Sequence, residues 1–204
     1  MKRRLPVLVE QAVGAVQAEA AEKGMAFERL LRKERQPTCQ PSCDHCCYHP
    51  LEISLFEAIP LYRYLVQRGR WTPSFVKTIQ RHAEHVQFQM TSVWLLTRIP
   101  CPLLADHRCS VYESRPLTCR TTWATGDPHY CHGQRFGEQT SLVPKADLIE
   151  AFQDQERFLA KQVGLTYYTM PISRALLYAA KVVNGELSIT DLRASLGDDF
   201  RKGG

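Results

Sequence analysis

The residues of this chain with the clearest chemical capacity are its eight cysteines. They form two groups of four, Cys39, Cys43, Cys46 and Cys47 in the spacing C-x3-C-x2-C-C, then Cys101, Cys109, Cys119 and Cys131. Thiolates are soft ligands that bind zinc, copper(I) and iron–sulfur clusters. We therefore expect folding to bring the two groups together around metal, with the rest of the chain holding that site.

The compartment decides whether such cysteines bind metal or form disulfides. The N-terminus begins like a signal peptide, but Glu10 and Gln11 interrupt its apolar run and no small-residue cleavage pattern follows. We therefore expect a cytoplasmic protein in a reducing compartment, where disulfides do not persist. No segment is apolar and long enough to span a bilayer, so we expect no membrane partner. The alternative, a secreted helical protein with four disulfides, requires export.

Spacing alone leaves the identity of the metal open. C-x3-C-x2-C is the spacing of the loop that holds three irons of a four-iron cluster in radical S-adenosylmethionine enzymes, but those enzymes place it in an α/β barrel, and this chain lacks the alternating pattern. Bacterial ferredoxins use related short spacings. The vicinal pair Cys46-Cys47 suits two metals, or one ligand beside a second thiol. Eight cysteines could supply two four-thiolate zinc sites or one cluster with spare thiols.

The second cysteine group carries cationic and aromatic neighbours. Arg115 and Arg120 flank Cys119, and their positive charge would favour its thiolate and offset the negative charge of a multi-thiolate site. Tyr112 could donate a hydrogen bond to a sulfur. The alternative interpretation is that both arginines form surface ion pairs.

Together these motifs resemble the YkgJ-like cysteine-cluster proteins, described as zinc- or iron-chelating. The family pattern is C-x3-C-x2-C-C, then Cys-Pro-x-Leu, then Cys-x-x-Tyr-x-x-Arg-Pro-x-x-Cys-Arg. This chain matches it in the first cysteine group, at Cys101–Leu104, and from Cys109 to Arg120. The resemblance covers residues 39–131 and implies a metal-binding cysteine cluster, with Cys131 in a looser final position. One distant branch, flagellin lysine N-methylase, implies a four-iron cluster and methyl transfer, but its members are longer than this chain.

Histidines and other polar residues are secondary candidates. His45 and His49 lie by the first cysteine group, and three more lie among the later cysteines, His107, His129 and His132. With eight thiols available, we expect histidines near the cluster to support ligands or face solvent. We expect the pair His82 and His85 to be surface residues. Glu57 is interpreted as a helix cap, and the aromatic residues Trp123, Tyr130, Tyr167 and Tyr168 as core residues more readily than pocket residues.

The elements that must position the cysteines are predicted to be mainly helical. Apolar periodicity, caps and breakers predict helices over 5–35, 54–68, 72–97, 144–163, 172–183 and 190–196, with Gly24 as a break or kink and 51–53 extended. Residues 100–140 show no periodicity. We expect a mainly α protein, a single helical domain over 1–204 around an irregular cysteine-rich centre at 39–131, flanked by helices at 1–36 and 141–200.

Two functions compete. A net charge of +5 is weak evidence for an anionic partner, and no phosphate-binding or protease motif occurs. The first hypothesis is a protein that holds an iron–sulfur cluster, typically 4Fe–4S, or zinc, and acts as an oxidoreductase or as a protein-modifying or methyl-transfer factor. The alternative is a structural zinc module that mediates protein or nucleic-acid interaction. Nucleic acid is not favoured, since C-x2-C knuckles beside a recognition helix are missing; enzymatic activity stays undecided.

Overall fold

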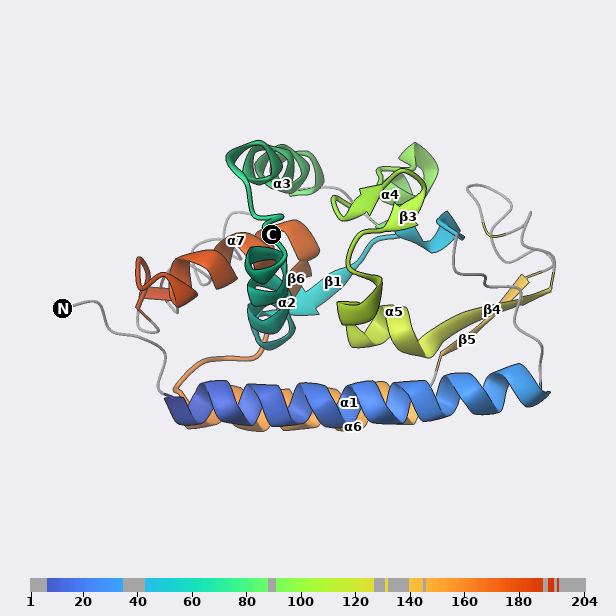
Figure 1. Ribbon diagram of the computed structural model, residues 1–204, viewed down its shortest axis with the longest axis horizontal. Coiled ribbons are helices and arrows are strands. Elements are labelled where there is room, and N and C mark those ends of the chain that lie inside the picture. Colours follow the sequence, from blue (N-terminus) through green and yellow to red (C-terminus); the bar gives the residue numbers. More distant parts are fainter. Residues whose placement is uncertain are drawn as a thin grey trace. The chain divides into compact units, whose positions relative to one another are not determined.

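The computed structural model describes residues 7–34, 43–87, 91–126, 131, 140–144, 146–188, 191, 192 and 194 (Figure 1). The chain divides into two compact units, which are described separately. The first unit contains residues 1–17, 52–88 and 153–204, and the second contains residues 18–51 and 89–152. Two long helices, α1 (Val7–Glu34) and α6 (Ala146–Gln162), contribute residues to both units. The prediction of a single domain over 1–204 stays a prediction.

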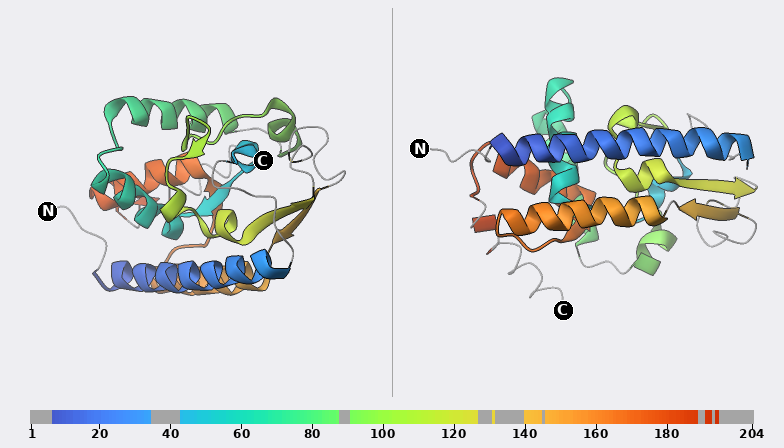
Figure 2. Two further views of the ribbon diagram at one scale, coloured as in Figure 1. Left: turned by 45° about the vertical axis from the view of Figure 1, so that its right-hand side comes forward. Right: turned by 90° about the horizontal axis from the view of Figure 1, so that it is seen from below.

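The first unit is built from helices and one short strand pair. Its remaining elements are β1 (Glu52–Ser54), α2 (Leu55–Gln67), α3 (Pro73–Val86), β6 (Thr169–Pro171) and α7 (Ile172–Val183). Helix α7 packs against both α2 and α3 (Figure 2). Strand β1 pairs antiparallel with β6, so that Ile53 lies opposite Met170. Strand β1 leads directly into α2, and strand β6 leads directly into α7. The apolar faces of these two helices form the core.

Local signals explain where these helices begin and end. The Ser54 hydroxyl accepts a hydrogen bond from the Glu57 amide at 3.1 Å, which caps the first turn of α2. The Thr72 hydroxyl caps α3 in the same way, with Pro73 in the first turn. Gly69 follows α2 with φ 63°, a left-handed conformation that costs glycine little. Gly164 and Gly185 hold equivalent positions after α6 and α7.

The second unit consists of short elements around the later cysteines. They are η1 (His45–Tyr48), α4 (Thr91–Thr97), β2 (Leu104–Ala105), β3 (Arg108–Cys109), η2 (Tyr112–Ser114), α5 (Leu117–Thr121), β4 (Thr122–Gly126) and β5 (Thr140–Pro144). Strand β2 pairs antiparallel with β3, and β4 with β5. Asp106 and His107 turn the first pair with φ 48° and 57°, the left-handed backbone of a tight hairpin.

Most of the predicted architecture is confirmed. The protein is mainly α, the capping box at Ser54 starts a helix, and α7 has the predicted bounds. Three expectations are wrong. Helix α1 continues through Gly24, whose backbone lies close to α5: a Cβ there would be 3.7 Å from Arg120 Cβ. The helix predicted over 72–97 is two helices, α3 and α4. The stretch 100–140 contains short strands and α5, which its lack of periodicity concealed.

Candidate metal centre

The first cysteine loop is folded by its own backbone into a turn of 3-10 helix. The Cys47 amide donates to the Asp44 carbonyl at 2.9 Å, and the His49 amide donates to the Cys46 carbonyl at 3.2 Å. Within this turn Cys46 is exposed, whereas Cys43 and Cys47 are half-buried. The loop therefore presents adjacent thiols, Cys46 to solvent and Cys47 inward. Cys39 lies outside the described residues.

A backbone hydrogen bond ties the second cysteine group to this loop. The Cys101 amide donates to the Cys47 carbonyl at 2.6 Å, across a separation of more than fifty residues. Beyond it, the Leu104 amide donates to the Cys101 carbonyl at 2.9 Å and starts the hairpin. Pairing of Leu104 with Cys109 then returns the chain toward Cys101. The buried side chain of Leu103 anchors this segment.

A hydrogen-bonded contact between His107 and Asp44 links the hairpin tip to the same loop. His107 Nδ1 lies 2.8 Å from Asp44 Oδ2, and the His107 side chain is 85% exposed while that of Asp44 is 16% exposed. His45 Nδ1 lies 3.9 Å from the other oxygen of Asp44. Asp44 thus connects the loop that carries Cys43 and Cys46 to the hairpin that carries Cys109. Sequence reasoning missed Asp44, because no local pattern signals a partner 63 residues away.

Helix α5 supplies Cys119 and is held by the arginines around it. Arg120 donates to the backbone carbonyls of Arg115 and Glu113, which fastens the turn before α5. Arg115 donates to the Tyr112 carbonyl at 3.0 Å and stacks on the Tyr112 ring at 3.6 Å. The buried residues Val111 and Leu117 anchor both ends of this segment. Arg120 therefore shapes the backbone, and a hydrogen bond from Tyr112 to sulfur stays a prediction.

Electrostatic interactions connect five thiols of the two cysteine groups. The charges of Cys46, Cys101 and Cys109 act on both Cys47 and Cys119. Burial raises the pKa of the Cys101 thiol to about 12, and burial with the neighbouring thiols raises that of Cys119 well above its usual value. Folding thus brings together thiols that do not all ionise at once unless a positive charge is bound among them.

The adjacent thiols of Cys46 and Cys47 have pKa shifts of opposite sign. A hydrogen bond with Cys47 lowers the pKa of Cys46 to about 7, and the same bond, followed by burial, raises the pKa of Cys47. The Arg115 guanidinium further favours the Cys46 thiolate and also acts on Cys119. Of the two arginines predicted to favour thiolates, Arg115 thus exerts that influence on thiols of both cysteine groups.

The remaining candidates lie at the edge of this group or away from it. The His49 ring hydrogen-bonds to the backbone of Cys131, and burial lowers the pKa of His49. Cys131 itself is buried. His129, Tyr130 and His132 lie outside the described residues, and so does the side chain of Trp123.

In the first unit, the prediction that His82 is a surface residue is wrong. His82 is buried and its Nδ1 lies 2.9 Å from the Ser173 hydroxyl, whereas His85 is exposed as expected. The cap of α2 is Ser54, which accepts a hydrogen bond from the Glu57 amide, and a capping role for the Glu57 side chain stays a prediction. Tyr167 packs against an apolar cluster around Val13 and Phe56.

The donor set fits a soft metal in its chemistry. Thiols from two segments are ligands that zinc and iron–sulfur clusters take, and the neighbouring Arg115 guanidinium offsets part of their negative charge. None of the seven described cysteines forms a disulfide. Within the described residues, no three Cys, His, Asp or Glu side chains are already arranged around a single ion. Closing the site around metal therefore requires side-chain rotation beyond the described arrangement.

Comparison with known proteins agrees with this chemistry. Residues 38–141 match the family model CxxCxxCC, "Putative zinc- or iron-chelating domain", over just over half of the chain. The chain belongs to this family. The YkgJ-like resemblance is thereby confirmed, and the matched residues contain all eight cysteines. No curated protein and no solved structure matches the chain. No helix among the described residues is long and apolar enough to cross a membrane.

Proposed function

We propose that the second unit of this zinc- or iron-chelating protein holds an iron–sulfur cluster through thiolates from both cysteine groups. The convergence of Cys46 and Cys47 with Cys101, Cys109 and Cys119 carries the proposal. Five thiols exceed the four that one tetrahedral zinc ion takes, and a vicinal pair suits a site with more than one metal. Cys39, Cys43 and Cys131 are the further candidate ligands.

The exposure of Cys46 would leave the centre accessible to a reaction partner, which favours a reactive centre over a buried structural one. Cys46 is exposed, and Arg115 places positive charge beside it. The protein residues would bind the cluster, and Arg115 with Asp44 and His107 would orient the segments. When bound, the cluster would supply electron transfer or a binding position for a small cofactor, in an oxidoreductase or a protein-modifying factor of a reducing compartment.

The test is anaerobic purification followed by iron, zinc and sulfide analysis with an absorption spectrum. We expect a brown protein with iron and acid-labile sulfide, and we expect Cys46→Ser and Cys109→Ser to lose them. Thr118→Ser, adjacent to Cys119 on α5, is the matched control and should keep wild-type metal content. Metal content that is unchanged in both cysteine variants would overturn the site.

Zinc is the second candidate, supported by the family description. Colourless protein with stoichiometric zinc and without sulfide would show that the cysteines hold zinc thiolate sites and not a cluster. Salt-dependent binding of DNA or RNA would then favour the interaction module over a reactive centre.

A further inference from the structure

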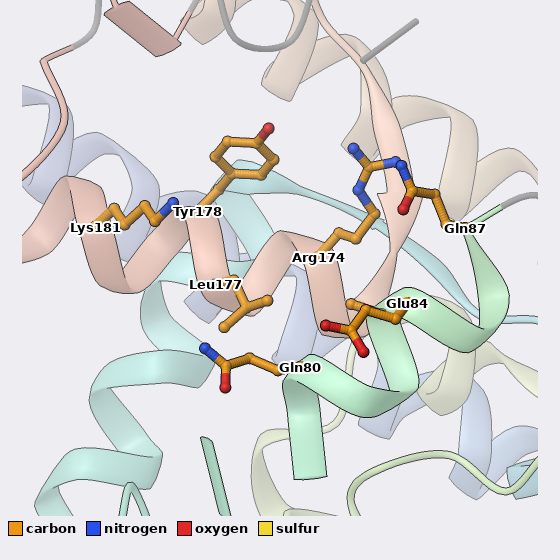
Figure 3. A pocket seen from close by; sticks show the side chains of 8 residues that line it. Gln80, Glu84, Gln87, Arg174, Leu177, Tyr178 and Lys181 are labelled. Carbon is orange, nitrogen blue, oxygen red and sulfur yellow. The ribbon is translucent and has the colours of Figure 1, made fainter. Parts of the chain in front are cut away.

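A cavity in the first unit is lined by residues that have no part in the cysteine centre. It lies between α3 and α7 and has a volume of about 200 Å³ (Figure 3). Its lining is drawn from one face of each helix, at positions 80, 83, 84 and 87 and at positions 174, 177, 178 and 181. Both sets follow the i, i+3, i+4, i+7 spacing of a single helical face. The cavity therefore runs along the seam of a helix pair.

The seam behind the cavity is firmly packed. The buried His82 Nδ1 lies 2.9 Å from the Ser173 hydroxyl, joining α3 to α7 one residue away from the lining positions 83 and 174. Ile79 and Leu176 are fully buried between the helices. The two walls are thus held at a fixed separation, which reduces the entropic cost of binding a ligand between them.

The walls carry opposite charges on opposite helices. Arg174 and Lys181 lie on α7, and Glu84 lies on α3. In the part of the chain that the structure describes, neither Lys181 nor Glu84 forms an ion pair. Figure 3 shows Lys181 and Arg174 at opposite ends of the α7 wall, with Glu84 on α3 at the end near Arg174. A ligand with a negative and a positive group would satisfy both walls.

The apolar part of the lining and the volume of the cavity further limit the class of ligand. Ala83 is buried and Leu177 is half-buried, and the Tyr178 ring stands over the same space, so part of the lining is apolar. A volume of about 200 Å³ is below the roughly 300–1,000 Å³ of drug-sized pockets. A single metabolite of amino-acid size fits this volume.

We infer that this cavity binds a free α-amino acid with an apolar side chain. The carboxylate is bound by the Arg174 guanidinium, which can donate two parallel hydrogen bonds, and Lys181 at the other end of the α7 wall adds to the positive potential. The ammonium group is held by Glu84. The side chain lies on Leu177 and Ala83. This site lies in the unit without the cysteines, so it does not depend on the metal centre.

Isothermal titration calorimetry on the full-length chain tests the inference with L-leucine as the probe. L-leucinamide lacks the carboxylate and 4-methylpentanoate lacks the ammonium group. We expect L-leucine to bind and each analogue to bind at least tenfold more weakly. Equal affinity for L-leucine and L-leucinamide, inorganic phosphate binding as tightly as L-leucine, or no binding of L-leucine at millimolar concentration would each overturn it.

Variants of the charged lining residues test which wall binds the carboxylate and which binds the ammonium group. Arg174→Gln with Lys181→Gln should abolish L-leucine binding, and Glu84→Gln should weaken L-leucine at least tenfold while leaving 4-methylpentanoate unchanged. Lys77→Gln, an exposed α3 residue outside the lining, is the matched control. Because Lys181 and Glu84 are exposed, their single variants should fold, as circular dichroism will verify. Wild-type binding by the double variant would contradict the assignment.

Discussion

The pH dependence of stability should be governed by one buried carboxyl group, Glu156 on α6. Its side chain is 1% exposed, and its Oε1 accepts a hydrogen bond from the Ser54 hydroxyl at 2.7 Å. Burial, followed by the neighbouring carboxyl of Glu57, raises the pKa of Glu156 from 4.5 to about 8. The hydrogen bond from Ser54 and the nearby Tyr167 hydroxyl oppose this shift but do not cancel it. Glu156 is therefore protonated in the folded protein at neutral pH.

The sign of the effect follows from this difference in proton affinity. Unfolded chain releases the Glu156 proton near pH 4.5, and folded chain holds it until about pH 8. The contribution to stability is fully present below pH 4.5 and is lost as pH rises toward 8. Each pH unit in that window removes about 1.4 kcal/mol. The total is on the order of a few kcal/mol, a large share of the stability of an ordinary domain.

Glu156→Gln removes the ionisation and keeps the shape of the side chain. We expect the variant to match the wild type in urea unfolding at pH 5 and to be more stable by a few kcal/mol at pH 8.5. Glu150→Gln, an exposed position on the same helix, is the control and should leave the pH profile unchanged. A stability difference between wild type and Glu156→Gln that is equal at both pH values would refute the reasoning.

Three further outcomes follow from the packing and the metal centre. Leu176→Ala, at a fully buried position of α7, should lower the free energy of unfolding by about 2–5 kcal/mol in urea titration. Gly69→Ala meets no neighbouring atom within 4 Å but must adopt φ 63°, so thermal unfolding should report a loss of about 1–2 kcal/mol. Removing metal from the purified protein with a chelator should lower the melting temperature, because metal binding energy contributes to folding, and readdition of metal should restore it.

The elements that sequence predicts best are those with local signals at both ends. Helix α2 has a capping serine before it and a left-handed glycine after it, and α7 ends at Asn184-Gly185 with the same geometry. Such signals act within a few residues of the boundary, so the pattern specifies them. The C-terminal end of α3 at Val86 has no comparable signal, because the apolar spacing continues into α4 and masks the change of helix.

Local sequence patterns do not encode the long-range partners of polar groups. Glu156 lies in an amphipathic helix among charged residues, yet Ser54, 102 residues away, draws it into the core. His82 has the spacing of a surface pair with His85, and its bond to Ser173 decides its burial. The cysteine groups are the exception, because clustered thiols have few roles besides metal binding, catalysis and disulfide formation, so their convergence can be expected from residue type alone.

The construction of the second unit explains why its fold and its chemistry are coupled. Most of its buried apolar residues come from short elements and turns, such as Leu103 and Val111 in the cysteine segment and Leu117 in α5. Short hairpins and single helical turns bury little apolar surface and are marginal without cross-links. The same segments carry thiols whose burial opposes ionisation, as at Cys101 and Cys119. A bound cation would reverse that opposition and join the segments at once, so loss of the proposed metal should weaken the packing of this unit along with its chemistry.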